Sequence, residues 1–313
     1  MTMAQMNMKE SPMAKTRCLD PVVLNLWHPL GALIELPVDT VVDTVLLEER
    51  LSLAVGLDGA VAVWQSCPDF AAGDKIDVAA VSKSLPAKVA YGYLWASLGS
   101  PPDELFHIPE YDEADRRRLN AATFGVNVSA PRAIENFLDM GHFPYVHTDI
   151  LGVEPHTEVK EYDVDISVER DEILATRCRF FQPLASSASE TGAEVEYIYR
   201  VPHPYCSVLY KSSPVDDARY DVIAVFMQPL SQESVRAHMM LCILDEDNED
   251  KVIKRFQQTI FGQDKPILEN QFPKRLPLDP RAETPIRADK SAIAYRRWLS
   301  QKDVRYGVIP ASN

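Results

Sequence analysis

The sequence lacks several features that would point to common classes of protein. No cysteine belongs to a Cys-x-x-Cys pair, so neither a zinc module nor a disulfide framework is predicted. No apolar stretch is long enough to cross a bilayer, and the glycines form no phosphate-binding loop. Positively charged residues are also outnumbered: the chain has 32 Lys and Arg but 46 Asp and Glu, which gives a net charge of −14. Nucleic acid and anionic membrane surfaces are therefore poor candidates as partners.

The beginning of the chain also lacks an apolar run. Residues 1–20 are polar and rich in methionine, which predicts a disordered tail and argues against a signal peptide. The five scattered cysteines are typical of reduced thiols in the cytosol. We therefore expect a soluble, cytoplasmic protein. Its 313 residues, 46% of them apolar, are enough for one large or two modest cores.

What the chain does contain divides into two regions after the tail. Residues 21–105 hold short β-type runs and predict a small all-β domain. Two of these runs, 51–55 and 60–64, flank an Asp-Gly pair, which is a strong hairpin signal. A third, aromatic-rich run covers 89–96 and is expected to form a strand.

The second region, residues 106–313, has a different pattern. Apolar residues recur at helical spacing over 130–141. Six alternating segments then follow between 155 and 245, and two further helices are expected at about 247–270 and 287–300. This order predicts an α+β domain in which a large antiparallel sheet wraps around a long helix.

Two histidines five residues apart, His142 and His147, follow the first of these helices. In a regular helix such side chains point about 140° apart, so a shared ion requires Pro144 to break or kink the helix between them. Asn136, Asp139 and His142 also recur every three residues beside an apolar face, where polar groups need partners. A structural or surface role for the two histidines is the alternative.

An aspartate on the later long helix, Asp264, has apolar neighbours three and four residues away on both sides, which predicts that it faces the core. Those neighbours are Ile260, Phe261, Ile267 and Leu268. A buried carboxylate needs a cation, which an arginine, a lysine or a metal ion would supply. With His142 and His147 it would form a two-histidine, one-carboxylate set, which suits Fe(II) and oxygen activation. Hydrolytic zinc chemistry is disfavoured because no general base is apparent.

At these residues the chain resembles the Rieske non-haem iron oxygenases, in the branch of vanillate, dicamba and methylxanthine demethylases. The family pattern Asp-x-x-His-x-x-x-x-His, followed much later by an Asp, is matched by Asp139, His142, His147 and Asp264. The C-terminal stretch 288–299 also resembles that branch.

The resemblance implies a helix-grip catalytic domain after a shortened Rieske-like β domain. It further implies that His142, His147 and Asp264 hold a mononuclear Fe(II). Asp139 would then relay electrons from a neighbouring subunit, and Asn136 would lie next to the ligands without binding the metal. Weaker assignments for the substrate pocket are Phe256 and Gln257, with core packing as the alternative for Phe256.

One departure from the family pattern affects the source of electrons. Family members ligate a [2Fe–2S] cluster with a Cys-x-His and a Cys-x-x-His pair. Here Cys67-Pro68-Asp69 stands at the first pair, and no cysteine lies between Cys67 and Cys178, so no cluster is expected in this chain. The resemblance then implies a Rieske-containing homologue or a reductase as partner, with NAD(P)H and flavin entering only through that reductase, in a trimer or mixed hexamer. Cluster-lacking subunits of bacterial demethylase complexes are similar in outline.

The expected function is therefore that of a terminal oxygenase subunit. It would hydroxylate a small aromatic or heteroaromatic substrate, with N- or O-demethylation of a compound such as a methylxanthine as the favoured reaction. Ring hydroxylation by the same iron is a second possibility. The alternative from another class is a catalytically silent scaffold or small-ligand-binding subunit.

Overall fold

The structure, a computed structural model, describes residues 18–184, 192–216, 218–245 and 247–311. Most of the disordered tail that the sequence predicts therefore lies outside the described residues. Among those that are described, no helix has the length and apolar character needed to span a membrane.

A seven-stranded antiparallel sheet forms the centre of the larger part, in the order β7-β13-β12-β11-β10-β9-β8. Its strands are β7 (Arg117–Val126), β8 (Asp163–Ser167), β9 (Glu172–Gln182), β10 (Ala193–His203), β11 (Cys206–Ser212), β12 (Tyr220–Ser231) and β13 (Ser234–Ile243). The last six are the predicted alternating segments. Strand β7 is not among them and was not predicted from the sequence. It is an edge strand that pairs only with β13, and edge strands carry more charge than central ones.

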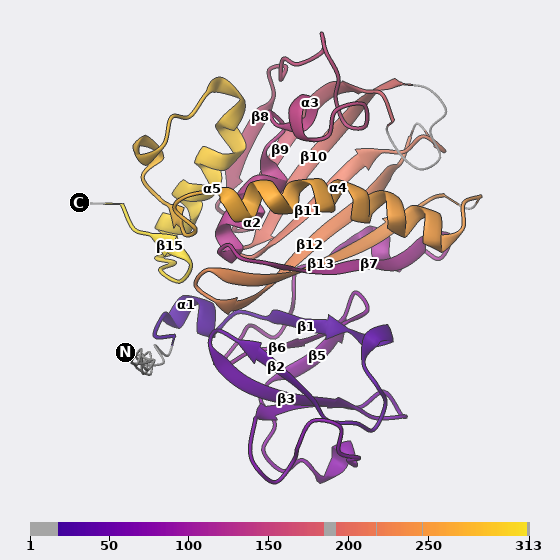
Figure 1. The fold of residues 1–313 in the computed structure, drawn as a ribbon, viewed down its shortest axis with the longest axis vertical. Helices are drawn as coiled ribbons and strands as arrows, with labels where there is room; N and C mark the ends of the chain where they lie inside the picture. The colour runs from indigo at the N-terminus through magenta and orange to yellow at the C-terminus, as the bar shows by residue number, and fades with distance from the viewer. Residues whose placement is uncertain (1–17, 185–191, 217, 246, 312–313) are drawn as a thin grey trace, which may run out of the picture.

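Three helices cover one face of this sheet (Figure 1): α2 (Ala130–Leu138), α4 (Asp250–Asn270) and α5 (Lys290–Gln301). Helix α4 runs across this face of the sheet. The ring of its Phe261 stacks on the ring of Phe124 in β7, and the two ring centroids are 4.5 Å apart. Helix α2 begins where the hydroxyl of Ser129 accepts a hydrogen bond from the Arg132 N–H at 3.2 Å. The predicted wrapping of a sheet around a long helix is confirmed.

The N-terminal part contains a short helix and two three-stranded antiparallel sheets, ordered β1-β6-β5 and β2-β3-β4. Its elements are α1 (Pro21–Leu24), β1 (His28–Ala32), β2 (Val42–Leu46), β3 (Glu49–Val55), β4 (Val61–Gln65), β5 (Ala87–Ala90) and β6 (Tyr93–Ala96). The predicted Asp-Gly hairpin joins β3 to β4. The run 89–96 is not one strand, because Tyr91 and Gly92 have φ of 55° and 76° and turn the chain back on itself.

The N-terminal sheets pack on the face of the large sheet that is opposite α4. Trp95 lies with its ring centroid 5.1 Å from that of Phe226 on β12, and Tyr93 lies 5.6 Å from the same ring. Side chains alternate along a strand, so every second residue of β11 and β12 points into this interface and the residues between them point toward α4.

The remaining short elements lie mainly in connecting segments. They are α3 (Phe143–Val146), the parallel pair β14 (Leu276–Pro277) and β15 (Val308–Ile309), and single 3₁₀ turns at Leu33–Glu35, Val78–Ala80, Pro109–Asp112, Pro280–Ala282 and Arg287–Asp289.

Candidate metal centre

The chain direction changes sharply between α2 and α3, which positions the first histidine. Helix α2 ends at Leu138, and Asp139 has extended backbone angles of φ −82° and ψ 121°. His142 is the residue before α3, and Pro144 lies in the first turn of that helix. The expectation that Pro144 breaks a helix is therefore wrong. The break precedes it, and Pro144 is compatible with the first turn of α3 because a first-turn residue needs no N–H donor.

The carboxylate of Asp139 stabilises this turn. One oxygen accepts a hydrogen bond from the Gly141 N–H at 2.7 Å, and the other accepts one from Nδ1 of His142 at 3.0 Å. The following helix, α3, is packed closely against Gly152, where an added Cβ would lie 2.7 Å from the Pro144 nitrogen. Together these contacts fix the backbone that carries His142 and His147.

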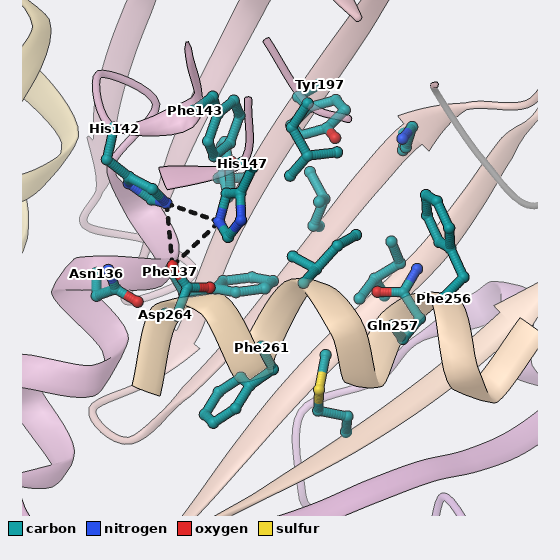
Figure 2. A pocket seen from close by; sticks show the side chains of 17 residues that line it. Asn136, Phe137, His142, Phe143, His147, Tyr197, Phe256, Gln257, Phe261 and Asp264 are labelled. Carbon is teal, nitrogen blue, oxygen red and sulfur yellow. Dashed lines mark hydrogen bonds and ion pairs between the residues drawn. The ribbon is translucent and has the colours of Figure 1, made fainter. Parts of the chain in front are cut away.

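His142, His147 and Asp264 converge on one point (Figure 2). Nε2 of His142 lies 3.1 Å from Nε2 of His147 and 3.2 Å from Oδ1 of Asp264, and the third side of the triangle is 3.0 Å. His147 and Asp264 are buried, while the side chain of His142 is 13% exposed. The ion pairs of Asp264 in the described structure are with these two histidines, not with the arginine or lysine that was the alternative.

The outer nitrogens of both rings already have acceptors. Asp139 accepts from Nδ1 of His142, and the side-chain carbonyl of Gln263 accepts from Nδ1 of His147 at 2.9 Å. In neutral rings this arrangement leaves each Nε2 with a lone pair and no proton. Oδ1 of Asp264 is also a bare acceptor, since it is buried without a well-aligned hydrogen-bond donor. Three lone pairs so close together need a positive charge between them.

The pKa values of the site point in the same direction. Burial by itself lowers the pKa of His142, but the nearby Asp139 and Asp264 carboxylates outweigh it and raise the pKa to about 9. For Asp264, burial raises the pKa, yet the proximity of His142 and His147 brings it below its ordinary value. The surroundings thus favour a cation at this point.

The size of the triangle indicates which coordination geometry it could accommodate. Three donors about 2.1 Å from one ion lie about 3.0 Å apart when the bonds are at right angles, and about 3.4 Å apart when they are tetrahedral. The observed edges of 3.0 to 3.2 Å agree with the right-angled, facial arrangement. The three residues could therefore hold a six-coordinate ion and leave its other positions free.

A pocket with about 560 Å³ of empty space, including its open mouth, adjoins the three residues between α4 and the sheet (Figure 2). Phe256 and Gln257, the two residues predicted for the substrate pocket, both line it, and so does Asn136. Its remaining walls are mainly apolar and aromatic: Phe137, Phe143, Leu151, Tyr197, Tyr199, Leu209, Ile223, Met239, Ile260 and Phe261, with Lys211 as an exception.

Asp139 lines a second cavity, which shares Asn136 and His142 with the first. Ile267 lines this second cavity and is 48% exposed, so the expectation that it shields Asp264 within an apolar face is wrong. Nearby, Arg132 and Arg296 share the buried carboxylate of Glu135. This cluster ties α5 to α2 one turn before Asp139.

Three contributors to the site were not identified from the sequence, namely Gln263, Gly152 and Lys211. Gln263 precedes Asp264, and adjacent residues of a helix usually point in different directions, so only the position of His147 reveals its role. The alternation of β11, which places position 211 on the same face as Leu209, was an available signal for Lys211.

Comparison with known proteins places the chain among characterised relatives. Residues 126–303 match the family model described as the vanillate O-demethylase oxygenase C-terminal domain. The chain is 46% identical over 287 residues to the probable methylxanthine N7-demethylase NdmC of Pseudomonas sp. (strain TJI-51), which covers 91% of this chain and 96% of that protein.

Two solved structures show the same fold. One is NdmA of Pseudomonas putida CBB5 with caffeine, with a TM-score of 0.72 at 20% identity over 90% of this chain and 92% of that one. The other is dicamba monooxygenase bound to dicamba, with a TM-score of 0.67 at 15% identity over 91% and 98%. The α+β architecture predicted from the sequence, with a β domain followed by a helix-grip domain, is confirmed.

Proposed function

Because this chain belongs to the Rieske-type oxygenases of the vanillate O-demethylase family, we propose that it is a terminal oxygenase subunit in which His142, His147 and Asp264 hold one Fe(II). The observation that carries the proposal is the convergence of three bare acceptor atoms at 3.0 to 3.2 Å in the wall of a pocket. Ferrous iron held on one face by such a set supplies open neighbouring positions for dioxygen activation.

The protein's own side chains prepare this site. Asp139 and Gln263 hold the protons on the outer nitrogens, so that both inner nitrogens face the metal position. The aromatic and aliphatic walls between α4 and the sheet exclude water and fit a flat ring. We assign substrate contact to Phe256 and Gln257, and a supporting position beside the metal ligands to Asn136 (Figure 2).

The proposed reaction is oxidative demethylation of a small aromatic or heteroaromatic compound. The relative that is 46% identical is named a probable methylxanthine N7-demethylase, which favours a methylxanthine as substrate. Overall, one atom of dioxygen would enter a methyl C–H bond, and the hydroxymethyl group would leave as formaldehyde. The second oxygen atom would become water, which requires two electrons from outside the chain.

We propose that a partner's Rieske centre supplies these electrons and that Asp139 receives them. The side chain of Asp139 is 33% exposed in the second cavity and is hydrogen-bonded to His142, so it connects the surface with the metal position. The chain offers only Cys67-Pro68-Asp69 at the family's first cluster pair, and Cys67 is packed among apolar side chains of the N-terminal part. We therefore assign residues 21–105 to a Rieske-like domain without a cluster, and infer an oligomer with a Rieske-bearing homologue or reductase.

Metal analysis tests the iron site directly. Anaerobically purified protein should contain about one iron per chain and no acid-labile sulfide. The variants His142→Ala and Asp264→Ala should lose the iron, because each removes one of three ligands, while His156→Ala should keep it as a matched control. Protein that takes up no Fe(II), or an iron content that neither ligand substitution lowers, would favour the silent scaffold or ligand-binding subunit instead.

The electron route has its own test. Asp139→Asn should retain iron but turn over at least about 100-fold more slowly with a Rieske-containing reductase and a methylxanthine, since the amide carries no charge and presents an N–H as well as an acceptor. Formaldehyde release measures demethylation, whereas a hydroxylated ring without formaldehyde would identify ring hydroxylation. Unchanged turnover in Asp139→Asn would refute the relay assignment.

A further inference from the structure

One charged side chain lies in the otherwise mainly apolar wall of the substrate pocket. Lys211 on β11 is only 5% exposed, and it is the only lysine or arginine among the described residues that line the pocket. It shares the α4-facing side of its strand with Leu209, while Val208 and Tyr210 face the N-terminal sheets. Its direction is therefore set by the strand and not by a mobile loop.

The neighbours of Lys211 place it in the same wall as the metal site. Its cross-strand partner on β10 is Tyr197, and its Nζ lies 5.4 Å from the centre of that ring. The Tyr197 ring is in turn 6.2 Å from that of Phe143, which is 6.1 Å from the ring of His147 (Figure 2). Lys211 and the three candidate ligands therefore line the same pocket.

A carboxylate lies on the other side of the lysine. Asp221 is its cross-strand partner on β12, and its charge favours the ammonium form. One oxygen of Asp221 already accepts the Leu244 N–H at 2.9 Å. Burial nevertheless lowers the pKa of Lys211 to about 7, against the smaller opposing effect of Asp221. An anion in the pocket would favour the charged ammonium.

We propose that Lys211 donates a hydrogen bond to an anionic oxygen or nitrogen of the substrate, so that the pocket selects flat aromatic rings that carry an acidic group. That group is an ionisable ring N–H beside a carbonyl, or a carboxylate. The inference rests on the proposed function and deepens it, because it names the substrates that the pocket prefers. A fully N-methylated ring has no such group and would leave the buried ammonium without this acceptor.

Equilibrium binding to the iron-loaded chain under anaerobic conditions tests the inference without turnover. The ligands are 7-methylxanthine, which keeps acidic ring N–H groups, caffeine, which has none, and vanillate, which carries a carboxylate. Lys211→Met keeps the length of the side chain and removes its charge. Leu209→Met, on the same strand and face, is the control for a change of shape alone.

Lys211→Met should weaken binding of 7-methylxanthine or vanillate by about 10- to 100-fold, as expected for a lost charged hydrogen bond. Caffeine affinity should change by less than about threefold, which also shows that the pocket remains folded. The ligand whose affinity falls in Lys211→Met identifies the acidic group that Lys211 binds. Leu209→Met should not discriminate between the ligands.

Two results would overturn the inference while leaving the proposed function intact. One is equal affinity of wild type and Lys211→Met for all three ligands, and the other is an equal loss for caffeine and the acidic ligands. Failure of the wild type to bind any of the three would instead overturn the inference together with the proposed demethylation.

Discussion

The hydrogen bond between Gln263 and His147 gives a sharp prediction about iron affinity. Gln263→Leu removes the acceptor that holds the proton on Nδ1 of His147, without changing any of the three proposed ligands. The bond is 2.9 Å long, and His147 is only 1% exposed, so water cannot easily replace the lost partner. The ring would then also be free to carry its proton on Nε2, which faces the metal position.

The expected loss follows from the cost of an unsatisfied buried donor. That cost is about 1 to 3 kcal/mol, and each 1.4 kcal/mol corresponds to a factor of ten. Gln263→Leu should therefore weaken Fe(II) binding by about 10- to 100-fold, which agrees with the usual effect of removing a partner of a metal-bound histidine. Gln263→Glu keeps an acceptor at this position and should retain Fe(II) at least as well as the wild type.

Anaerobic competition against a chelator of known affinity measures this difference. Gln257→Leu is the matched control, because it makes the same change on the same helix at a residue that lines the pocket and makes no ligand hydrogen bond in the described structure. It should bind Fe(II) like the wild type. The reasoning is refuted if Gln263→Leu binds within about threefold of the wild type, or if both leucine variants lose affinity equally.

Two further predictions concern the scaffold. Glu135→Leu should lower the free energy of unfolding by about 3 to 5 kcal/mol in urea denaturation, because Glu283 is then the only carboxylate among the described residues that pairs with the two buried arginines, Arg132 and Arg296. The control Glu158→Leu removes only an exposed ion pair and should cost less than about 1 kcal/mol, so equal losses would contradict this reading. Gly152→Ala should move α3, since its Cβ would lie 2.7 Å from the Pro144 nitrogen, and should reduce iron content with little change in the far-ultraviolet circular dichroism spectrum. Full iron occupancy in Gly152→Ala would contradict this prediction, because it would show that α3 can move without displacing His142 and His147.

The local pattern of the sequence was sufficient for much of the fold. Alternation of apolar and polar residues marked strands β8 to β13, since they belong to one sheet with a face covered by helices. The apolar neighbours of Asp264 marked it as buried on α4, although Ile267 proved exposed. These predictions succeeded because burial of one face leaves a periodic signal within a single element.

Strand β7 and the Tyr91–Gly92 turn were not predicted, because neither produces such a periodic signal within its own sequence. An edge strand such as β7 takes its conformation from its partner β13, and its own sequence begins with two charged residues, Arg117 and Arg118. The run 89–96 is apolar enough for one strand, and only packing of both β5 and β6 in the same sheet decides that it folds into a hairpin.

The sequence by itself determined which residues could be ligands, because His142, His147 and Asp264 are chemically suited and two of them lie close together in the chain. Only the tertiary structure decided that Asp264, more than a hundred residues later, lies 3.0 Å from His147, and that the break before Pro144 turns both rings inward. It also decided which groups Gln263 and Lys211 lie beside. Their chemistry is ordinary in isolation, and it becomes specific only through the neighbours that α4 and the sheet bring to them.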